Sequence, residues 1–592
     1  MMTNRWLNVV LAVIVTVGLA GVAIYERPRA AEERAELLDQ DVATIDDADD
    51  ADAGADDAEA EADPDDGGAA STDTAGAGPE IEPGGDPDAV ADADGSYGVT
   101  ASHPLAVDVG IAVLDAGGNA VDAAVAVSYA LSVVEPFGSG LGGGGAMLVH
   151  PPGEAPTSYD YREIAPQSGE IPASEIGVPG FAAGLAHVHA EHGTADLASL
   201  ITPAIELAED GFEVDAGLAE RLEGAAHRLP INQLPRYFPD GQPLQPGDVL
   251  VQPEHADALR MVRDEGPAVM HSGELGQAIA EAVGGLDLED LEAYEVVETP
   301  VATGELGDYE VLSGGPPVSG PTLVEHLQIA EAGGIADLEP GSAEHTHLFA
   351  QAFRIAYADR TNFITDPVVE DVPLEELLSP DYAADQAGTI PDDGFVPVDD
   401  ESASTSPETD TTHIVTVDPT GTMVSTTNTL SNFFGSGLPI SGFFMNDQLK
   451  NFSRDPESVN YPAPGKRPRS FITPTIVASD DQPVLGLGSP GGRRIPTITA
   501  QVLLRWGVHG ESIEDATTAP RVHLEGRELQ FEESPDAAAA NDLVSWGYEV
   551  VDDIPLTEYY GAIQALLHDP ETGELSGIAD ERRSGDWRVD QP

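Results

Sequence analysis

The chain has 592 residues, of which 41% are hydrophobic, so it is long enough to bury a substantial core. Its formal charge is −81, from 106 acidic against 25 basic residues, and Lys450 and Lys466 are its two lysines. A field of this sign repels polyanions and argues against a nucleic-acid partner. The chain has no cysteine, which excludes disulfides, thiolate nucleophiles and cysteine metal ligands.

The acidic excess is not confined to the N-terminal segment and continues through the globular part of the chain. Acid enrichment with almost no lysine suggests adaptation to molar salt, where the Debye length falls to roughly 3 Å and self-repulsion is screened. We therefore expect a haloadapted protein.

The first 96 residues divide into two segments. Residues 7–25 are almost unbroken apolar residues, about the length of one membrane crossing, so residues 1–29 are predicted to form an uncleaved anchor. A cleaved signal peptide is the alternative, and flanking arginines on both sides leave the orientation open. Residues 30–96 are rich in Ala, Asp, Glu, Gly and Pro, with 12 acidic residues among the 21 from 46 to 66. They are predicted to form a disordered acidic tether.

From residue 97 the composition becomes globular. Apolar spacing predicts a helix over 105–114, ended by Gly117-Gly118-Asn119, and a buried helix over 120–134. The glycine-rich run 140–145 precedes a predicted strand at 146–149. This run lacks the Lys-Ser/Thr ending of a phosphate loop. Helical patterns dominate residues 181–283, and mixed elements follow to about residue 371.

Residues 391–410 are polar and read as an exposed loop. Two alternating apolar runs follow, 413–417 and 423–426, joined by the turn Asp418-Pro419-Thr420-Gly421. This pattern predicts a β-hairpin whose first strand begins beside the loop. Such a junction suits a strand that must acquire a free N-terminus.

Thr411 stands at the start of this strand. A threonine hydroxyl is a weak nucleophile, but the α-amine of a chain-terminal threonine, with an ordinary pKa of about 7.7–8.0, can act as its base. That chemistry requires cleavage of the bond between Asp410 and Thr411. Taken alone, these residues fit an ordinary polar strand start at least as well.

Residues 411–453, which read TTHIVTVDPTGTMVSTTNTLSNFFGSG and continue to NDQLKNFS, resemble the start of the small subunit of γ-glutamyltransferases. Further matches follow the family's order over nearly all of 97–583. They are GGNAVDAAVA (117–126), LGGGG (141–145), YREIAP (161–166), GVPG (177–180), AYADR (356–360), PGKRPRS (464–470) and GSPGG (488–492).

The resemblance implies a role for each matching residue. Thr411 would be the autoprocessing residue and nucleophile, and Thr429 would position it. Gly491 and Gly492 would hold the developing oxyanion through backbone N–H groups. Arg162 would bind the α-carboxylate of a γ-glutamyl group as a bidentate fork. Further substrate-pocket positions are Ser431, Gln448, Asn451, Ser470 and Phe471.

The chain departs from the family pattern at three of these positions. Asn451 stands where an aspartate normally binds the substrate's α-ammonium, so selectivity for the ammonium should weaken. Phe471 replaces the second serine of a pair that contacts the α-carboxylate. Ser431 stands where an asparagine is common. The segment 452–466 also looks short against relatives that carry a lid, which predicts an open pocket.

Two other groups of residues receive structural interpretations. His345 and His347 lie two residues apart, but no third ligand is placed by spacing, so a polar helix start is favoured over a metal site. Asp359 and Arg360 are expected to form structural ion pairs.

The resemblance implies an α+β fold, the four-layer αββα sandwich of the N-terminal-nucleophile (Ntn) hydrolases, with no cofactor and no metal. Residues 97–410 and 411–592 would be the large-subunit and small-subunit parts of one domain, associated as a heterodimer after cleavage before Thr411. The enzyme would face outward from the membrane, or be secreted if the anchor is removed. It would transfer a γ-glutamyl group from glutathione-like or γ-glutamyl peptides to water or an amine. The alternatives are a glutaryl- or cephalosporin-type acylase and an unprocessed membrane-tethered binding protein.

Overall fold

The computed structural model describes residues 95–397, 409–552, 554, 560–570 and 572–591, all within one compact unit, residues 75–592. The predicted anchor and all but the last two residues of the predicted tether lie outside these residues. Within the described ranges, every helix is too short or too polar to cross a bilayer.

Two antiparallel sheets form the centre of the fold. The first has the order β20 (Asp586–Asp590), β1 (Tyr97–Ala101), β9 (Thr409–Val417), β10 (Met423–Asn432), β2 (Gly144–His150), β3 (Thr157–Asp160) and β6 (Val297–Thr299). The second has the order β19 (Glu574–Ala579), β18 (Gln564–Asp569), β14 (Gln482–Gly488), β13 (Thr475–Ser479), β8 (Tyr309–Ser313) and β7 (Ala302–Leu306).

The sheets pack face to face through a buried apolar cluster. Val415 and Met423 of the first sheet meet Ile476 and Leu566 of the second, and all four are excluded from solvent. The alternating apolar residues of each strand supply this layer, as expected for stacked sheets.

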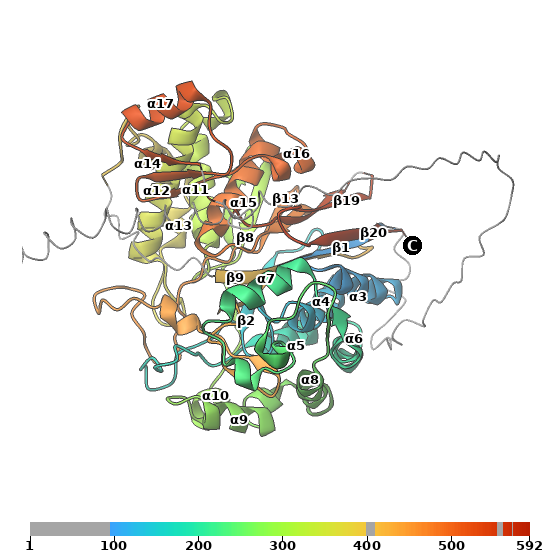
Figure 1. The fold of residues 1–592 in the computed structure, drawn as a ribbon. Helices are drawn as coiled ribbons and strands as arrows, with labels where there is room; N and C mark the ends of the chain where they lie inside the picture. Colours follow the sequence, from blue (N-terminus) through green and yellow to red (C-terminus); the bar gives the residue numbers. More distant parts are fainter. Residues whose placement is uncertain (1–94, 398–408, 553, 555–559, 571, 592) are drawn as a thin grey trace, which may run out of the picture. The chain divides into compact units, whose positions relative to one another are not determined.

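Helices cover the outer face of each sheet (Figure 1). Beside the first sheet lie α3 (Pro104–Asp115), α4 (Ala120–Val134), α5 (Phe181–His192), α6 (Leu197–Asp210) and α8 (Pro253–Glu265). Beside the second lie α11 (Gly320–Ala332), α12 (Ala343–Phe363) and α15 (Ile495–Leu503). The predicted four-layer αββα sandwich is confirmed.

Smaller elements surround these layers. The helices are α7 (Ala216–Ala225), α9 (Glu274–Ala282), α10 (Leu288–Glu292), α13 (Leu374–Leu377), α14 (Pro380–Ala387), α16 (Ile513–Thr518) and α17 (Ala537–Ser545). The strands are β4 (Phe212–Glu213), β5 (Val249–Leu250), β11 (Pro439–Ile440), β12 (Phe443–Phe444), β15 (Val522–Glu525), β16 (Glu528–Phe531) and β17 (Glu549–Val551).

The predicted helix pair after residue 97 is confirmed. α3 and α4 differ from the predicted ranges by at most one residue at either end, and α4 is buried along its whole length. Asn119 caps α4, because its side chain accepts from the Asp122 N–H while the Asp122 carboxylate accepts from the Asn119 N–H. The break read from Gly117-Gly118-Asn119 is therefore a helix end followed by a capping box.

The predicted hairpin is also confirmed, as β9 and β10 at the middle of the first sheet. Their register pairs Thr411 with Thr429. Beyond that pair the register shifts, so that Ser431 lies opposite Asp410. A β-bulge of this kind bends the strand locally and commonly lies beside an active site.

Candidate active site

Thr411 lies near the start of β9, with only 4% of its surface exposed. Across the hairpin, the Ser431 N–H donates to the Thr429 hydroxyl oxygen at 2.9 Å. Ser431 has a φ of +82°, which is uncommon for a residue with a Cβ. The bulge therefore positions the Thr429 hydroxyl through a hydrogen bond to its oxygen.

A pocket of about 290 Å³ opens onto this pair. Most of the predicted site residues line it, namely Thr411, Thr429, Ser431, Gln448, Asn451, Ser470, Phe471 and Gly492. Gln448 and Asn451 reach it from one 3-10 turn, η5 (Gln448–Asn451). The structure thus brings together residues that are up to 81 positions apart in the sequence.

The two glycines predicted to bind an oxyanion begin the 3-10 turn η6 (Gly492–Arg494) after β14. Gly491 has a φ of +134° and Gly492 a φ of +58°. Residues with a Cβ avoid the first of these conformations, so glycine is required there by the backbone. Gly492 lines the pocket, while Gly491 precedes it outside the lining.

Arg162 does not line the pocket and is fully buried. Its Nη2 and Nε both contact the Asp160 carboxylate, at 2.7 Å and 3.2 Å. Its Nη1 donates to the Pro468 carbonyl at 2.8 Å. The guanidinium expected to bind substrate is therefore held by a carboxylate of its own chain. Asp410 is placed only by its backbone, opposite Ser431.

The structure adds pocket residues that sequence reasoning missed: Glu175, Tyr357, Lys450, Arg454, Ile472, Arg493 and Ile495. Lys450 is one of the chain's two lysines and lies 3.2 Å from the Asp447 carboxylate. Arg454 is 3.5 Å from Glu175, with its side chain 94% exposed. Three cationic side chains thus line the pocket, each beside a carboxylate: Lys450 with Asp447, Arg454 with Glu175 and Arg493 with Glu525. The rarity of lysine could have drawn attention to Lys450.

Among the residues that the structure describes, neither Asp359 nor Arg360 forms the expected ion pair. The Asp359 carboxylate accepts from the Tyr382 hydroxyl at 2.7 Å. Arg360 donates from Nε to the Ser319 hydroxyl at 3.0 Å and from Nη2 to the Ser470 carbonyl at 3.3 Å. Consecutive residues on α12 face different neighbours, and for Arg360 these are neutral groups.

The histidines in Glu344-His345-Thr346-His347 lie in the first turns of α12, which agrees with a polar helix start. His347 is hydrogen-bonded through both ring nitrogens, to the Tyr548 hydroxyl at 2.8 Å and the Pro391 carbonyl at 2.9 Å. In the ranges that the structure covers, no three His, Cys, Asp or Glu side chains gather as a metal site would require.

Glu163, next to Arg162, is fully buried, and burial raises the pKa of its carboxyl from 4.5 to about 8. Because the folded-state pKa is the higher one, the folded chain binds the extra proton. Its contribution to stability is present below pH 4.5 and is lost as the pH rises to about 8. We expect Glu163→Gln to raise the urea midpoint of unfolding at pH 8.5, with little difference at pH 4. The exposed Glu457→Gln is the control, and parallel pH profiles of Glu163→Gln and wild type would contradict the assignment.

A threonine near the start of a central strand of an αββα sandwich, in a pocket with a glycine turn, defines the Ntn-hydrolase class. Comparisons with known proteins narrow the class. A family model described as gamma-glutamyltranspeptidase matches residues 106–589. The chain therefore belongs to the gamma-glutamyltranspeptidase family, and it is an enzyme.

Individual relatives cover most of the chain. The capsule biosynthesis protein CapD proenzyme of Bacillus anthracis is 37% identical over 496 residues, covering 83% of this chain and 91% of the relative. The glutathione hydrolase proenzyme of Bacillus subtilis is 33% identical over 534 residues, covering 82% and 90%. The crystal structure of a cephalosporin acylase from Bacillus halodurans has a TM-score of 0.75 at 27% identity, covering 84% of this chain and 96% of that one.

Proposed function

We propose that this protein is a γ-glutamyl hydrolase and transpeptidase that cuts its own chain before Thr411. The observation that carries the proposal is Thr411 itself, which lines the pocket near the start of β9 and is paired with Thr429 across the hairpin. Two relatives are named proenzymes, which agrees with a precursor that is cut. The donor would be a glutathione-like or γ-glutamyl peptide, and the acceptor water or an amine.

The reaction uses groups of the cut chain. The freed α-amine of Thr411 takes the proton of the Thr411 hydroxyl as its oxygen attacks the amide carbonyl. Backbone N–H groups at Gly491 and Gly492 stabilise the negative charge on the carbonyl oxygen. As this intermediate collapses, the α-ammonium returns the proton to the leaving nitrogen, the C–N bond breaks, and an acyl ester remains on Thr411. Water or an amine acceptor then attacks the ester and regenerates the hydroxyl.

The two fragments should stay together after the cut. β10 and β9 from Thr411 onward would belong to residues 411–592, while their sheet neighbours β1 and β2 belong to residues 97–410. Backbone hydrogen bonds to β1 and β2 therefore continue across the boundary on both sides of the hairpin. The core between the sheets also draws on both parts, since it contains Leu148 and Leu312 of residues 97–410 together with Val415 and Ile476 of residues 411–592. Neither part has a complete core alone.

Acyl specificity depends on the amino-acid end of the pocket. Asn451 supplies an amide where an aspartate would attract an α-ammonium, and Phe471 supplies an apolar ring where a serine would donate. An acylase that accepts a glutaryl-type group, which has the carboxylate but no adjacent ammonium, is the second candidate. The likeness to the cephalosporin acylase structure also favours it.

The ratio of kcat/KM on γ-glutamyl and glutaryl anilides separates the two candidates. We expect Asn451→Asp to raise the γ-glutamyl:glutaryl ratio about tenfold, because a carboxylate binds an ammonium by a charge-assisted hydrogen bond. Asn541→Asp, an exposed change on α17, adds the same charge far along the chain and serves as the control. A large wild-type preference for the γ-glutamyl anilide would exclude the acylase candidate. An unchanged ratio in Asn451→Asp would exclude the role given to Asn451.

The proposal also includes a location for the enzyme, at the cell surface. Residues 1–29 would anchor the chain with the enzyme facing outward, and residues 30–96 would hold it away from the membrane. The apolar run and the acidic composition support this arrangement. N-terminal sequencing of the purified protein distinguishes an anchor from a removed signal peptide, and it also reports the internal cut.

The same proposal includes salt adaptation, supported by the net charge of −81 and the presence of only two lysines. We expect dialysis into very dilute buffer to unfold and inactivate the protein, because unscreened like charges repel one another. Circular dichroism and activity, each measured in dilute buffer and in molar salt, check this. A chain that stays folded and active in dilute buffer would not be haloadapted.

A further inference from the structure

Arg360 lies directly behind one wall of the active-site pocket. It comes from α12, and only 5% of its surface is exposed. The guanidinium carbon is 3.9 Å from the centroid of the Phe471 ring. Tyr357, one turn earlier on α12, stacks on the same ring with an interplanar angle of 9°. Because Phe471 and Tyr357 both line the pocket, one aromatic layer separates Arg360 from a bound acyl group.

The charge of Arg360 has no carboxylate partner among the residues that the structure describes. Its side chain donates to the Ser319 hydroxyl and the Ser470 carbonyl, both neutral. Two neighbouring guanidiniums differ in this respect, since Arg162 contacts Asp160 and Arg493 contacts Glu525. A buried cation without a counter-ion is costly unless an anion compensates it.

The surroundings of Arg360 increase the demand for an anion. Burial, together with the positive charges of Arg469, Arg493 and Arg162 and against an opposing effect of Tyr357, lowers the pKa of its guanidinium to about 9. The group nevertheless remains cationic at neutral pH. A site that already disfavours one positive charge attracts a negative charge and rejects a second positive one. Asn451 fits this preference, because the aspartate that is usual at its position would favour an ammonium.

We propose that Arg360 is the charge by which this pocket selects an acyl group with a terminal carboxylate, acting through the wall formed by Ser470 and Phe471. The inference rests on the proposed function, since it assumes that the acyl group occupies this pocket. Arg360 does not touch the substrate, so it is a positioning residue that determines specificity. A low-dielectric aromatic wall transmits its field better than water would. Arg162 is poorly suited to this task, because Asp160 already neutralises it.

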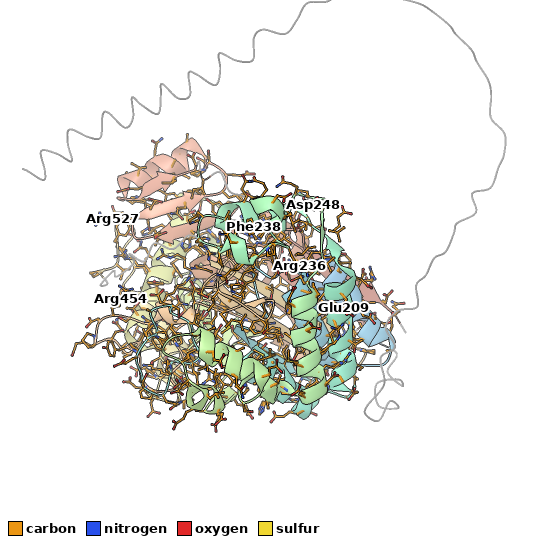
Figure 2. The ribbon with its side chains drawn as sticks, turned by 60° about the horizontal axis from the view of Figure 1, so that its bottom comes forward. Glu209, Arg236, Phe238, Asp248, Arg454 and Arg527 are labelled. Carbon is orange, nitrogen blue, oxygen red and sulfur yellow. The ribbon has the colours of Figure 1, made fainter. Side chains whose placement is uncertain are left out.

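Calorimetric binding of glutarate and pentanoate tests the inference without requiring turnover. The two probes have the same carbon chain and differ by one carboxylate. We expect Arg360→Met to weaken glutarate binding about tenfold while pentanoate binding changes little. Arg360→Lys, which keeps the charge, should retain most of the glutarate affinity. Arg236→Met is the matched control, because Arg236 pairs with Glu254 on the surface, well away from Arg454 at the pocket (Figure 2).

A second variant covers the case in which Arg360→Met does not fold. Phe471→Ala removes the ring without adding a hydrogen-bond donor and opens the pocket onto the guanidinium, so glutarate should bind about tenfold more tightly relative to pentanoate. Equal weakening of both probes in Arg360→Met, or an unchanged probe ratio in Phe471→Ala, would overturn the inference. A wild-type protein that binds glutarate but does not turn over acyl anilides would count against the proposed function instead.

Discussion

Thr411→Ala leaves one intact chain on a denaturing gel and abolishes turnover of acyl anilides. The alanine has no hydroxyl, so it can neither attack the Asp410 carbonyl to cut the chain nor accept an acyl group afterwards. We expect kcat to fall by about 10⁴-fold or more, the scale of losing a catalytic nucleophile. Wild type should instead give two bands, the smaller of which begins at Thr411. Gel electrophoresis, N-terminal sequencing and anilide release measure both effects.

Thr411→Ser is the matched control for this prediction. Serine keeps the hydroxyl and, after cleavage, the α-amine on the same residue, so scission and measurable activity should both persist. Thr411 is nearly buried in β9, and losing one methyl group there should cost little stability. Turnover by an uncut wild-type chain would refute the mechanism, because the base would then be absent. A single uncut wild-type band without turnover would favour the binding-protein alternative.

The sequence predicted the hairpin well because its signals are local. Alternating apolar residues over 413–417 and 423–426, with a four-residue turn between them, define both strands and their pairing. The bulge beyond Thr429 was not predicted, because a register shift depends on the partner strand and leaves no pattern in either strand alone. Its consequences, the positive φ of Ser431 and the contact with the Thr429 hydroxyl, were equally hidden.

The contacts of the charged residues were also not predicted from the sequence, because they depend on distant segments of the chain. The resemblance identified Arg162 as a carboxylate ligand, but its pairing with Asp160 follows from the way the chain leaves β3. Arg360 was expected to form an ion pair, yet it donates to Ser319 and Ser470, which lie 41 and 110 positions away in the sequence. Motifs indicate which residues gather in a pocket. Tertiary packing decides which of their charges are already neutralised.

Gly491→Ala should reduce kcat about 10²- to 10³-fold. The variant should still fold, and its self-cleavage before Thr411 should become slow. The reason is conformational. Gly491 has a φ of +134°, whereas an added Cβ would meet its nearest atom, the Gly561 Cα, at 3.4 Å, an ordinary contact. The structure therefore has room for an alanine side chain at position 491, but alanine disfavours the backbone conformation that is required there. Relaxation toward a negative φ would rotate the peptide that supplies the Gly492 N–H, and losing one oxyanion donor costs about this much rate.

Gly285→Ala separates this effect from the general cost of a side chain at positive φ. Gly285 has a φ of +101° and the same closest approach of 3.4 Å, here to the Pro172 side chain, and it does not line the pocket. Both variants should lose similar stability in urea unfolding, but only Gly491→Ala should lose kcat on anilides. If the two variants lose activity in proportion to stability, the η6 turn has no special part in catalysis. If Gly491→Ala alone fails, with its KM nearly unchanged, its backbone acts on the transition state, because an interaction made only there lowers kcat without weakening substrate binding.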